Sequence, residues 1–341
     1  MMTTWIIAGF CVLVAALIFW PKHGLIGHWR EARRLSSRVL REDALKHVLK
    51  AEVNGEWPTI HSLAGALQIK PNRVAQLLGE MEARGFVSYA EGKLRLRKTG
   101  RDLALHIIRA HRLWESYLAE QTGVAEAEWH QRAEKKEHLL SPKQAADLAA
   151  QLGHPTHDPH GDAIPAADGE LRAERGESLN SVSVGTPVRI THIEDEPEAV
   201  YAQLCAQGLR AGMRICVLEK TGAGIRFWAD GAEHVLAPLL ADNISVTALT
   251  GLPASDLFEE HYLSGLKPGE RATVLGLSPA CRGSERRRLL DLGFVAGTPV
   301  AIELVSPAGD PTAYLVRGTM VALRREQAGL IRISKQQALA A

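Results

Sequence analysis

Cysteine is scarce in this sequence, and none of it is arranged as a metal-binding or redox pair. Among 341 residues only Cys11, Cys205, Cys216 and Cys281 are cysteines, and no two form a Cys-x-x-Cys motif. This argues against a zinc ribbon and a disulfide scaffold, and it fits a reducing compartment. A phosphate-cradling loop and a nucleophile elbow are also missing. We therefore expect no enzyme, and a metal-dependent hydrolase is only a weak alternative.

Net charge is small as well, at +1, but the charges are unevenly spread along the chain. Residues 28–101 hold 15 Lys and Arg against 8 Asp and Glu, whereas residues 102–175 hold 8 against 13. A basic stretch next to an acidic one fits a nucleic-acid surface beside a cation site. Ordinary surface variation is the alternative explanation.

The beginning of the chain is uncharged and almost wholly apolar from Trp5 to Trp20. Twenty helical residues reach about 30 Å, the thickness of a hydrocarbon core, and arginines follow the segment but do not precede it. We predict a single-pass anchor over residues 1–26, with the remainder of the chain on the cytoplasmic side of the inner membrane. A cleaved signal peptide lacks its basic start and its small-residue cleavage site here, and an interfacial segment is the other alternative.

A helix-turn-helix pattern follows within residues 36–98. Apolar spacing predicts a helix from Ser36 to Val53, a short helix capped by Thr59, and a helix that begins at Pro71. The stretches 86–89 and 93–97 are predicted to pair as a basic hairpin. Helix, turn, helix and wing is the arrangement that places a recognition helix in the major groove of DNA.

Six polar side chains in this region are candidates for contact with double-stranded DNA. Those on the recognition helix can reach base edges, and those on the wing can meet phosphates. They are Asn72, Arg73, Gln76, Lys93, Arg95 and Arg97. Winged helices also serve as protein-interaction modules, which is the alternative.

Histidines and carboxylates recur at helical spacing in the next region, residues 99–165. His111 and Glu115 are four residues apart, and a second set follows on a helix predicted from about Ala125 to Leu140. Each set lies along one helix face and could replace the hydration shell of a divalent cation. A solvated, salt-bridged face is the usual meaning of glutamates and lysines at this spacing; the histidines favour metal, because imidazole is the commonest transition-metal ligand.

These motifs resemble the diphtheria-toxin-repressor family of metal-dependent regulators over residues of about 36–165. The resemblance rests on the winged-helix stretch, on residues 96–101 and 111–115, on the run from His130 to His138, and on residues 153–165. It implies a homodimer that binds a palindromic DNA operator in response to Mn²⁺ or Fe²⁺. It also implies two adjacent metal sites, whose ligands carry over position by position.

The resemblance assigns seven residues to those sites. The primary set is Asp43, Glu134, Glu137 and His138, and the ancillary set is His111, Glu115 and His130. Oxygen donors at Asp43 and Glu134 are typical of the manganese branch rather than the sulfur-containing iron branch. One departure is Lys46, which stands where the manganese branch has a second carboxylate. A cation shared by Asp43 and the later helix would favour one orientation of the winged helix.

A second histidine-rich cluster follows, with three prolines that make it rigid. It consists of His154, His157, Asp158, His160 and Asp162. The composition could bind metal, but the family carries a similar segment as a structural closure of the dimer domain, and we favour the structural role.

The C-terminal half contains an internal repeat at an offset of 85 residues. Residues 204–212 recur as residues 289–297, each flanked by apolar strands, and a polar linker at 166–181 precedes the first copy. Short strands with glycine turns predict two small barrels, at 182–249 and 266–334. They resemble FeoA domains, SH3-like barrels linked to ferrous-iron transport, and protein contact is their expected role. For Arg282, Arg286, Arg287 and Arg288 we favour a solvated helix face over a partner surface.

Together these features predict a multidomain α+β chain: a transmembrane helix, a winged helix-turn-helix, a helical metal-binding and dimerisation domain, and two SH3-like β-barrels. The favoured function is a membrane-anchored, Mn²⁺- or Fe²⁺-responsive transcription regulator of metal homeostasis. The alternative is an accessory or sensor subunit of a ferrous-iron transporter that does not bind DNA. The doubled barrels favour the alternative, and the seven-ligand match with the wing favours the regulator.

Overall fold

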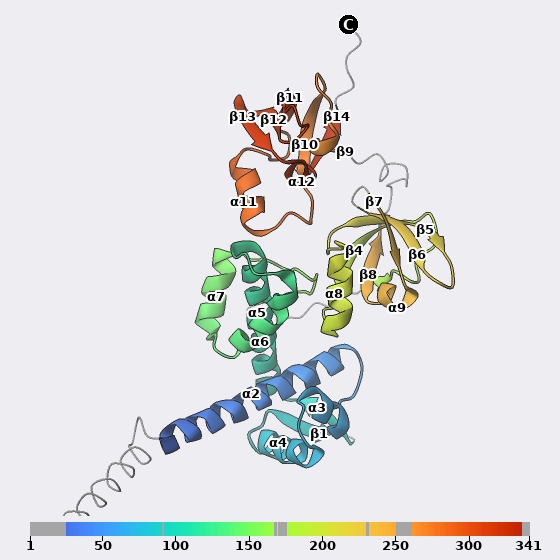
Figure 1. Ribbon diagram of the computed structural model, residues 1–341. Helices are drawn as coiled ribbons and strands as arrows, with labels where there is room; N and C mark the ends of the chain where they lie inside the picture. The colour runs from blue at the N-terminus through green and yellow to red at the C-terminus, as the bar shows by residue number, and fades with distance from the viewer. Residues whose placement is uncertain are drawn as a thin grey trace, which may run out of the picture. The chain divides into compact units, whose positions relative to one another are not determined.

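The computed structural model describes residues 25–90, 92–166, 169, 176–229, 232–249 and 261–335 (Figure 1). Within these residues no helix is both long and apolar enough to cross a membrane. The first helix, α2 (Leu25–Val53), has 29 residues but carries charged side chains along its length, which a hydrocarbon core does not accept. The predicted location in the inner membrane is therefore wrong. The apolar segment on which it rested, Trp5 to Trp20, lies outside the described residues.

The chain divides into two compact units, and the first contains residues up to Arg109 together with 166–170. Here α2 begins at Leu25, earlier than the start predicted at Ser36. It is followed by α3 (Ile60–Ala66), α4 (Pro71–Ala83), β1 (Val87–Ala90) and β2 (Lys93–Leu96). The order helix, turn, helix, hairpin is the one predicted for a winged helix.

Local sequence explains the boundaries of these helices. The Thr59 hydroxyl accepts a hydrogen bond from the Ser62 amide at 3.0 Å and caps α3. Pro71 occupies the first turn of α4, where its missing N–H costs nothing. Val74, Leu77, Leu78 and Met81 are buried on one face of α4, which fixes its rotation and leaves the opposite face exposed.

Helix α5 (Lys98–Gln121) contributes its first half to one unit and its second half to the other. Its first turn is fixed to the winged helix: the Thr99 hydroxyl donates to the Gly85 carbonyl at 2.7 Å, and Arg101 pairs with Glu52. A Cβ on Gly100 would lie 2.1 Å from the Phe86 carbonyl oxygen. The close approach of α5 to the wing therefore requires glycine at this position.

The second unit begins with the remainder of α5 and three further helical segments, η1 (Glu126–Glu128), α6 (Trp129–Glu137) and α7 (Pro142–Gln151). The helix predicted to reach Leu140 ends earlier, and His138 is its C-cap. A capping box at Ser141 begins α7, with its hydroxyl accepting a hydrogen bond from the Gln144 amide. Ala110, Leu113, Ala145, Leu148 and Ile164 form the apolar core between these segments.

Two six-stranded sheets complete the second unit. The first copy contains β3 (Glu177–Ser178), β4 (Pro187–Ile193), α8 (Glu198–Ala206), β5 (Arg214–Lys220), β6 (Ile225–Ala229), β7 (Ala232–Leu236), α9 (Pro238–Ala241) and β8 (Ile244–Ala248). The second contains β9 (His261–Tyr262), η2 (Leu263–Gly265), β10 (Arg271–Leu277), α11 (Gly283–Asp291), β11 (Pro299–Val305), β12 (Thr312–Val316), β13 (Thr319–Leu323), α12 (Arg325–Ala328) and β14 (Ile331–Lys335).

The two copies share one topology, which confirms the repeat. Their strand orders are β3-β8-β4-β5-β6-β7 and β9-β14-β10-β11-β12-β13. Bulges also recur at matching places, at Ile190/His192 in β4 and at Val274/Gly276 in β10. Each copy encloses its own apolar core. The expected linker 166–181 is interrupted at its end, because Glu177 and Ser178 pair with β8 as an edge strand.

Candidate metal centre

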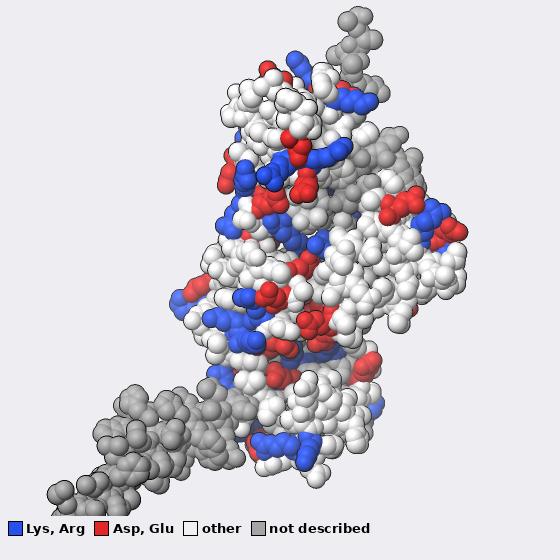
Figure 2. All heavy atoms as spheres, in the orientation of Figure 1, with Lys and Arg blue, Asp and Glu red and all other residues white. Residues whose placement is uncertain are grey.

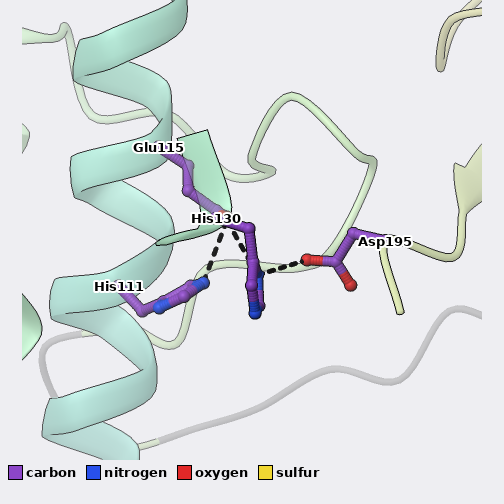
Figure 3. A group of neighbouring side chains, drawn as sticks. All are labelled: His111, Glu115, His130 and Asp195. Atoms are coloured by element: carbon purple, nitrogen blue, oxygen red, sulfur yellow. Dashed lines mark hydrogen bonds and ion pairs between the residues drawn. The ribbon is translucent and has the colours of Figure 1, made fainter. Parts of the chain in front are cut away.

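The ancillary set predicted from the sequence comes together in the second unit. His111 and Glu115 lie one turn apart on α5, and His130 lies on the first turn of α6 (Figure 3). Nε2 of His111 is 2.9 Å from Oε1 of Glu115, and Nδ1 of His130 is 3.5 Å from the same oxygen. Their ligand atoms lie within 4.8 Å of one another, which is the separation expected of groups that share one cation.

A fourth donor, Asp195, comes from the first barrel and was missed by the sequence analysis. It follows β4 in the loop Glu194–Glu196, and its Oδ2 lies 2.8 Å from Nδ1 of His130. Figure 3 shows this carboxylate pointing toward His130 from the side opposite α5. An acidic triplet directly after a predicted strand was the available signal, but nothing in the sequence places it beside α6, 65 residues earlier in the numbering.

A second donor set shares Glu115 with the first. It consists of Glu115, Asp158 and His160, all three buried. Nδ1 of His160 lies 3.5 Å from Oε2 of Glu115, and the Asp158 carboxylate accepts the backbone amides of His160 and Asp162 at 2.9 Å each. The sequence analysis favoured a structural role for this segment. The loop nevertheless presents an imidazole to a buried glutamate, an arrangement that could also hold a cation.

The remaining predicted ligands lie next to these two sets. Glu137 is buried and contacts Nδ1 of His111, and its other oxygen is 3.5 Å from Nε2 of His138. Glu134 is half exposed and lies 3.6 Å from Nε2 of His130. His111 therefore touches a member of each predicted set. Asp43 is partly buried on α2 in the first unit, and its membership of the primary set stays a prediction.

Carboxylates surround the imidazoles of this cluster and shift their pKa values. Burial lowers the pKa of His130, but Asp195, Glu115 and Glu134 outweigh this and raise it to about 12. Burial likewise opposes protonation of His160, yet Glu115 raises the pKa to about 9. For Glu115 burial acts to raise the pKa, and His111 with the other imidazoles brings it well below the usual range. Bound protons thus supply positive charge that a divalent cation would replace.

The residues fit a divalent cation on a further ground. Nε2 of His160 has no hydrogen-bond partner among the described residues, and Nδ1 has only the 3.5 Å contact with Glu115, although the side chain is 2% exposed. An unsatisfied buried imidazole is costly, and coordination of a cation would satisfy it. Imidazole with carboxylate oxygen is a donor set that suits Mn²⁺ or Fe²⁺, whereas the absence of thiolate donors disfavours softer metals.

The six predicted DNA contacts lie in the first unit, on α4 and the wing. Asn72, Gln76, Arg95 and Arg97 are exposed, while Arg73 and Lys93 are partly buried. Figure 2 shows cationic side chains gathered on the part of this unit formed by α4 and β1. Trp57, a residue that the sequence analysis did not single out, is 42% exposed. Nζ of Lys93 lies 4.2 Å and Cζ of Arg95 lies 5.0 Å from its ring centroid.

Two segments of the chain match known protein families. The family described as iron dependent repressor, metal binding and dimerisation domain, matches residues 97–166, and the FeoA domain matches residues 261–335. The chain is therefore similar to metal-dependent repressors over its metal-binding and dimerisation region and to FeoA domains over its second barrel. The FeoA match covers the second barrel, and the first barrel is related to it by topology.

Individual relatives agree with this assignment. The iron-dependent repressor IdeR of Mycobacterium tuberculosis is 27% identical over 208 residues, which span 57% of this chain and 90% of the relative. The diphtheria toxin repressor of Corynebacterium diphtheriae is 26% identical over 217 residues, or 60% of this chain and 95% of the relative. Repressors are not catalysts, which confirms the prediction that the chain is not an enzyme.

Two further comparisons concern metals. A solved manganese-dependent transcriptional repressor in complex with manganese is 28% identical, has a TM-score of 0.55, and covers 61% of this chain and 100% of that chain. A probable metal transport system membrane protein of Chlamydia trachomatis is 40% identical over 82 residues, which are 24% of this chain and 18% of that protein.

Proposed function

We propose that the chain is a divalent-metal-responsive, DNA-binding transcription regulator of metal homeostasis, with Mn²⁺ or Fe²⁺ as its effector. The observation that carries the proposal is the pair of donor sets that share Glu115 on α5, the helix whose first turn is fixed to the winged helix. The relatives named as iron-dependent and manganese-dependent repressors support it.

The second half of α5 supplies His111 and Glu115, and α6 supplies His130. Coordination of one cation by these side chains and Asp195 would hold α5, α6 and the first barrel together. Metal shifts a conformational equilibrium only by its differential affinity for the two states. The state in which these elements converge is therefore the one that metal favours.

Asp43 is the residue we assign, from the family resemblance, to the primary set with Glu134, Glu137 and His138. A cation shared by these ligands would fix one orientation of the winged helix, so that two recognition helices of a homodimer match the half-sites of a palindromic operator. Asn72, Arg73 and Gln76 would then reach base edges, and Lys93, Arg95 and Arg97 would meet phosphates.

The test is selection of duplex DNA from a random pool by the full chain, with Mn²⁺, with Fe²⁺ under anaerobic conditions, and with chelator. A palindromic sequence enriched only with metal is the expected result. Asp43→Ala should weaken metal-stimulated binding about tenfold or more and leave the dimer intact by light scattering, with Asp102→Ala as a control. Absence of any enriched sequence under all three conditions would overturn the proposal.

A further inference from the structure

The second barrel contacts the end of α5 through α11. Nη2 of Arg287 donates to the Glu120 carbonyl at 3.1 Å, one of the last carbonyls of α5, which lack helical partners. Gly283, at φ +60°, lies against the same helix end: a Cβ there would be 3.1 Å from the Thr122 oxygen and 3.4 Å from the Ala119 oxygen. A cation at a helix C-terminus is favourable, so this contact is specific rather than incidental.

Arg282, the residue before α11, extends this contact to the metal centre. Its Nη2 donates to the Pro159 carbonyl at 3.2 Å, and its Cζ lies 5.8 Å from the ring centroid of Trp129. Pro159 directly precedes His160, and Trp129 directly precedes His130. One guanidinium therefore holds the neighbour of a donor in each of the two sets. The expectation of a solvated face for this arginine is wrong, since Arg282 is partly buried against these groups.

Trp129 is itself held in place by its surroundings, so it can couple the position of Arg282 to that of His160. It is 4% exposed, its Nε1 donates to the Val124 carbonyl at 3.0 Å, and its ring centroid is 6.2 Å from that of His160. A shift of Arg282 would change the packing of the Trp129 ring and the position of the 157–161 loop together. Both elements deliver an imidazole to Glu115.

Within the described residues, the second barrel and α5 nevertheless do not share one continuous apolar core. A cavity of about 550 Å³ lies beside it, lined by residues of α5, of the 157–161 loop and of both barrels, including Ser116, Asp158, Arg189, Cys281 and Arg286. Polar interfaces of this kind within a chain usually allow relative motion. We therefore expect relative motion between the second barrel and α5.

From these contacts we infer that the second barrel is a latch on the metal centre, and that Arg282 is its positioning residue. The docked barrel favours the arrangement in which His130 and His160 converge on Glu115. Because coupling is reciprocal, metal must strengthen docking by the same factor by which docking strengthens metal binding. This inference rests on the proposed metal site, and it adds that the FeoA-type barrel regulates the affinity of that site.

The experiment compares the full chain with Arg282→Ala, Arg282→Lys and the exposed control Arg288→Ala on the same helix. Mn²⁺ affinity is measured by competition with a fluorescent chelator, and thermal unfolding verifies that each variant is folded. We expect Arg282→Ala to bind Mn²⁺ about tenfold more weakly, as for other residues that orient metal ligands. Arg282→Lys should restore only part of the Mn²⁺ affinity, because lysine lacks the planar guanidinium that stacks on Trp129 while donating hydrogen bonds. The control Arg288→Ala should bind Mn²⁺ like the parent.

Hydrogen exchange supplies a readout that a purely structural role would not move. In the parent chain, Mn²⁺ should slow amide exchange in residues 283–290, which hold none of the proposed ligands, and Arg282→Ala should abolish that effect. The latch proposal would be overturned if Arg282→Ala bound Mn²⁺ as tightly as the parent. It would also be overturned if Mn²⁺ did not change amide exchange in residues 283–290 of the parent. Failure to find an operator, with both linked effects present, would count against the regulator and leave the latch standing.

Discussion

Nδ1 of His130 and Oδ2 of Asp195 lie 2.8 Å apart and join the metal-binding helices to the first barrel. The pair connects α6 with the loop after β4, so the first barrel supplies one carboxylate to the candidate metal centre. A donor set that needs both α6 and the first barrel is complete only when the two are packed together. The affinity for metal should therefore depend on that packing.

Removal of Asp195 should weaken metal binding. We expect Asp195→Ala to reduce Mn²⁺ affinity about 10- to 100-fold, because it removes an oxygen donor or the group that orients His130. Chelator competition measures this effect, and Glu219→Ala, whose carboxylate pairs with Arg226 on the exposed face of the same barrel, is the control. An unchanged affinity in Asp195→Ala would exclude the barrel from the site.

Glu115 should matter more than Glu134. Glu115 is 1% exposed and belongs to both donor sets, whereas Glu134 is half exposed at the margin. Glu115→Gln keeps the side-chain size but loses the charge that the imidazoles of His111, His130 and His160 face, so tight Mn²⁺ binding should be lost from both sets. After gel filtration, mass spectrometry should find less bound metal in Glu115→Gln than in Glu134→Gln. The reverse order would contradict the assignment of Glu115 as the shared ligand.

Trp57 should strengthen DNA binding although it carries no charge. Its ring holds Lys93 and Arg95 by cation–π contacts, which would fix two of the proposed phosphate contacts before DNA binds. We expect Trp57→Ala to weaken operator binding about three- to tenfold, from contacts worth roughly 0.5–1 kcal/mol each, and Trp57→Phe to retain most of the affinity. Fluorescence anisotropy at fixed salt is the measurement, since phosphate contacts depend strongly on ionic strength.

Gly161 should be required for the fit between the 157–161 loop and the first barrel. An added Cβ would lie 1.9 Å from the Thr191 carbonyl oxygen, and the residue has φ +95°. Strain and overpacking together should make Gly161→Ala less stable by about 2–4 kcal/mol. Gly185 has φ +81° but open space around it, so Gly185→Ala reports the backbone strain alone. Thermal denaturation of both variants separates the two effects, and equal losses would refute close packing at Gly161.

Metal should stabilise the folded chain by mass action. A ligand at 100 times its Kd adds about 2.7 kcal/mol if it binds the native state alone. We therefore expect saturating Mn²⁺ to raise the unfolding midpoint of the parent by several degrees, and the gain to disappear in Glu115→Gln. Mg²⁺, which retains its water shell and has little affinity for imidazole, should give a much smaller shift.

The sequence predicted local features well where one residue controls one boundary. Thr59, Pro71 and Ser141 begin their helices where capping rules place them, and the 85-residue repeat gave two sheets of identical order. The helix over 125–140 was overextended, because its apolar and charged spacing continues past Glu137 while the backbone turns at His138. The membrane location was inferred from an apolar run and the arginines that follow it, and the described helices do not support it.

The sequence by itself determined which side chains could act together within one helix, since i, i+4 spacing fixes His111 with Glu115 and His130 with Glu134. Only the tertiary structure brought Asp195 to His130 and His160 to Glu115, and set Arg282 against Trp129 and Pro159. Spacing along a helix is dictated by its 3.6-residue period, whereas contacts between a loop, a barrel and a helix depend on how separate cores dock. No local pattern encodes that docking, which decides how the metal centre is completed.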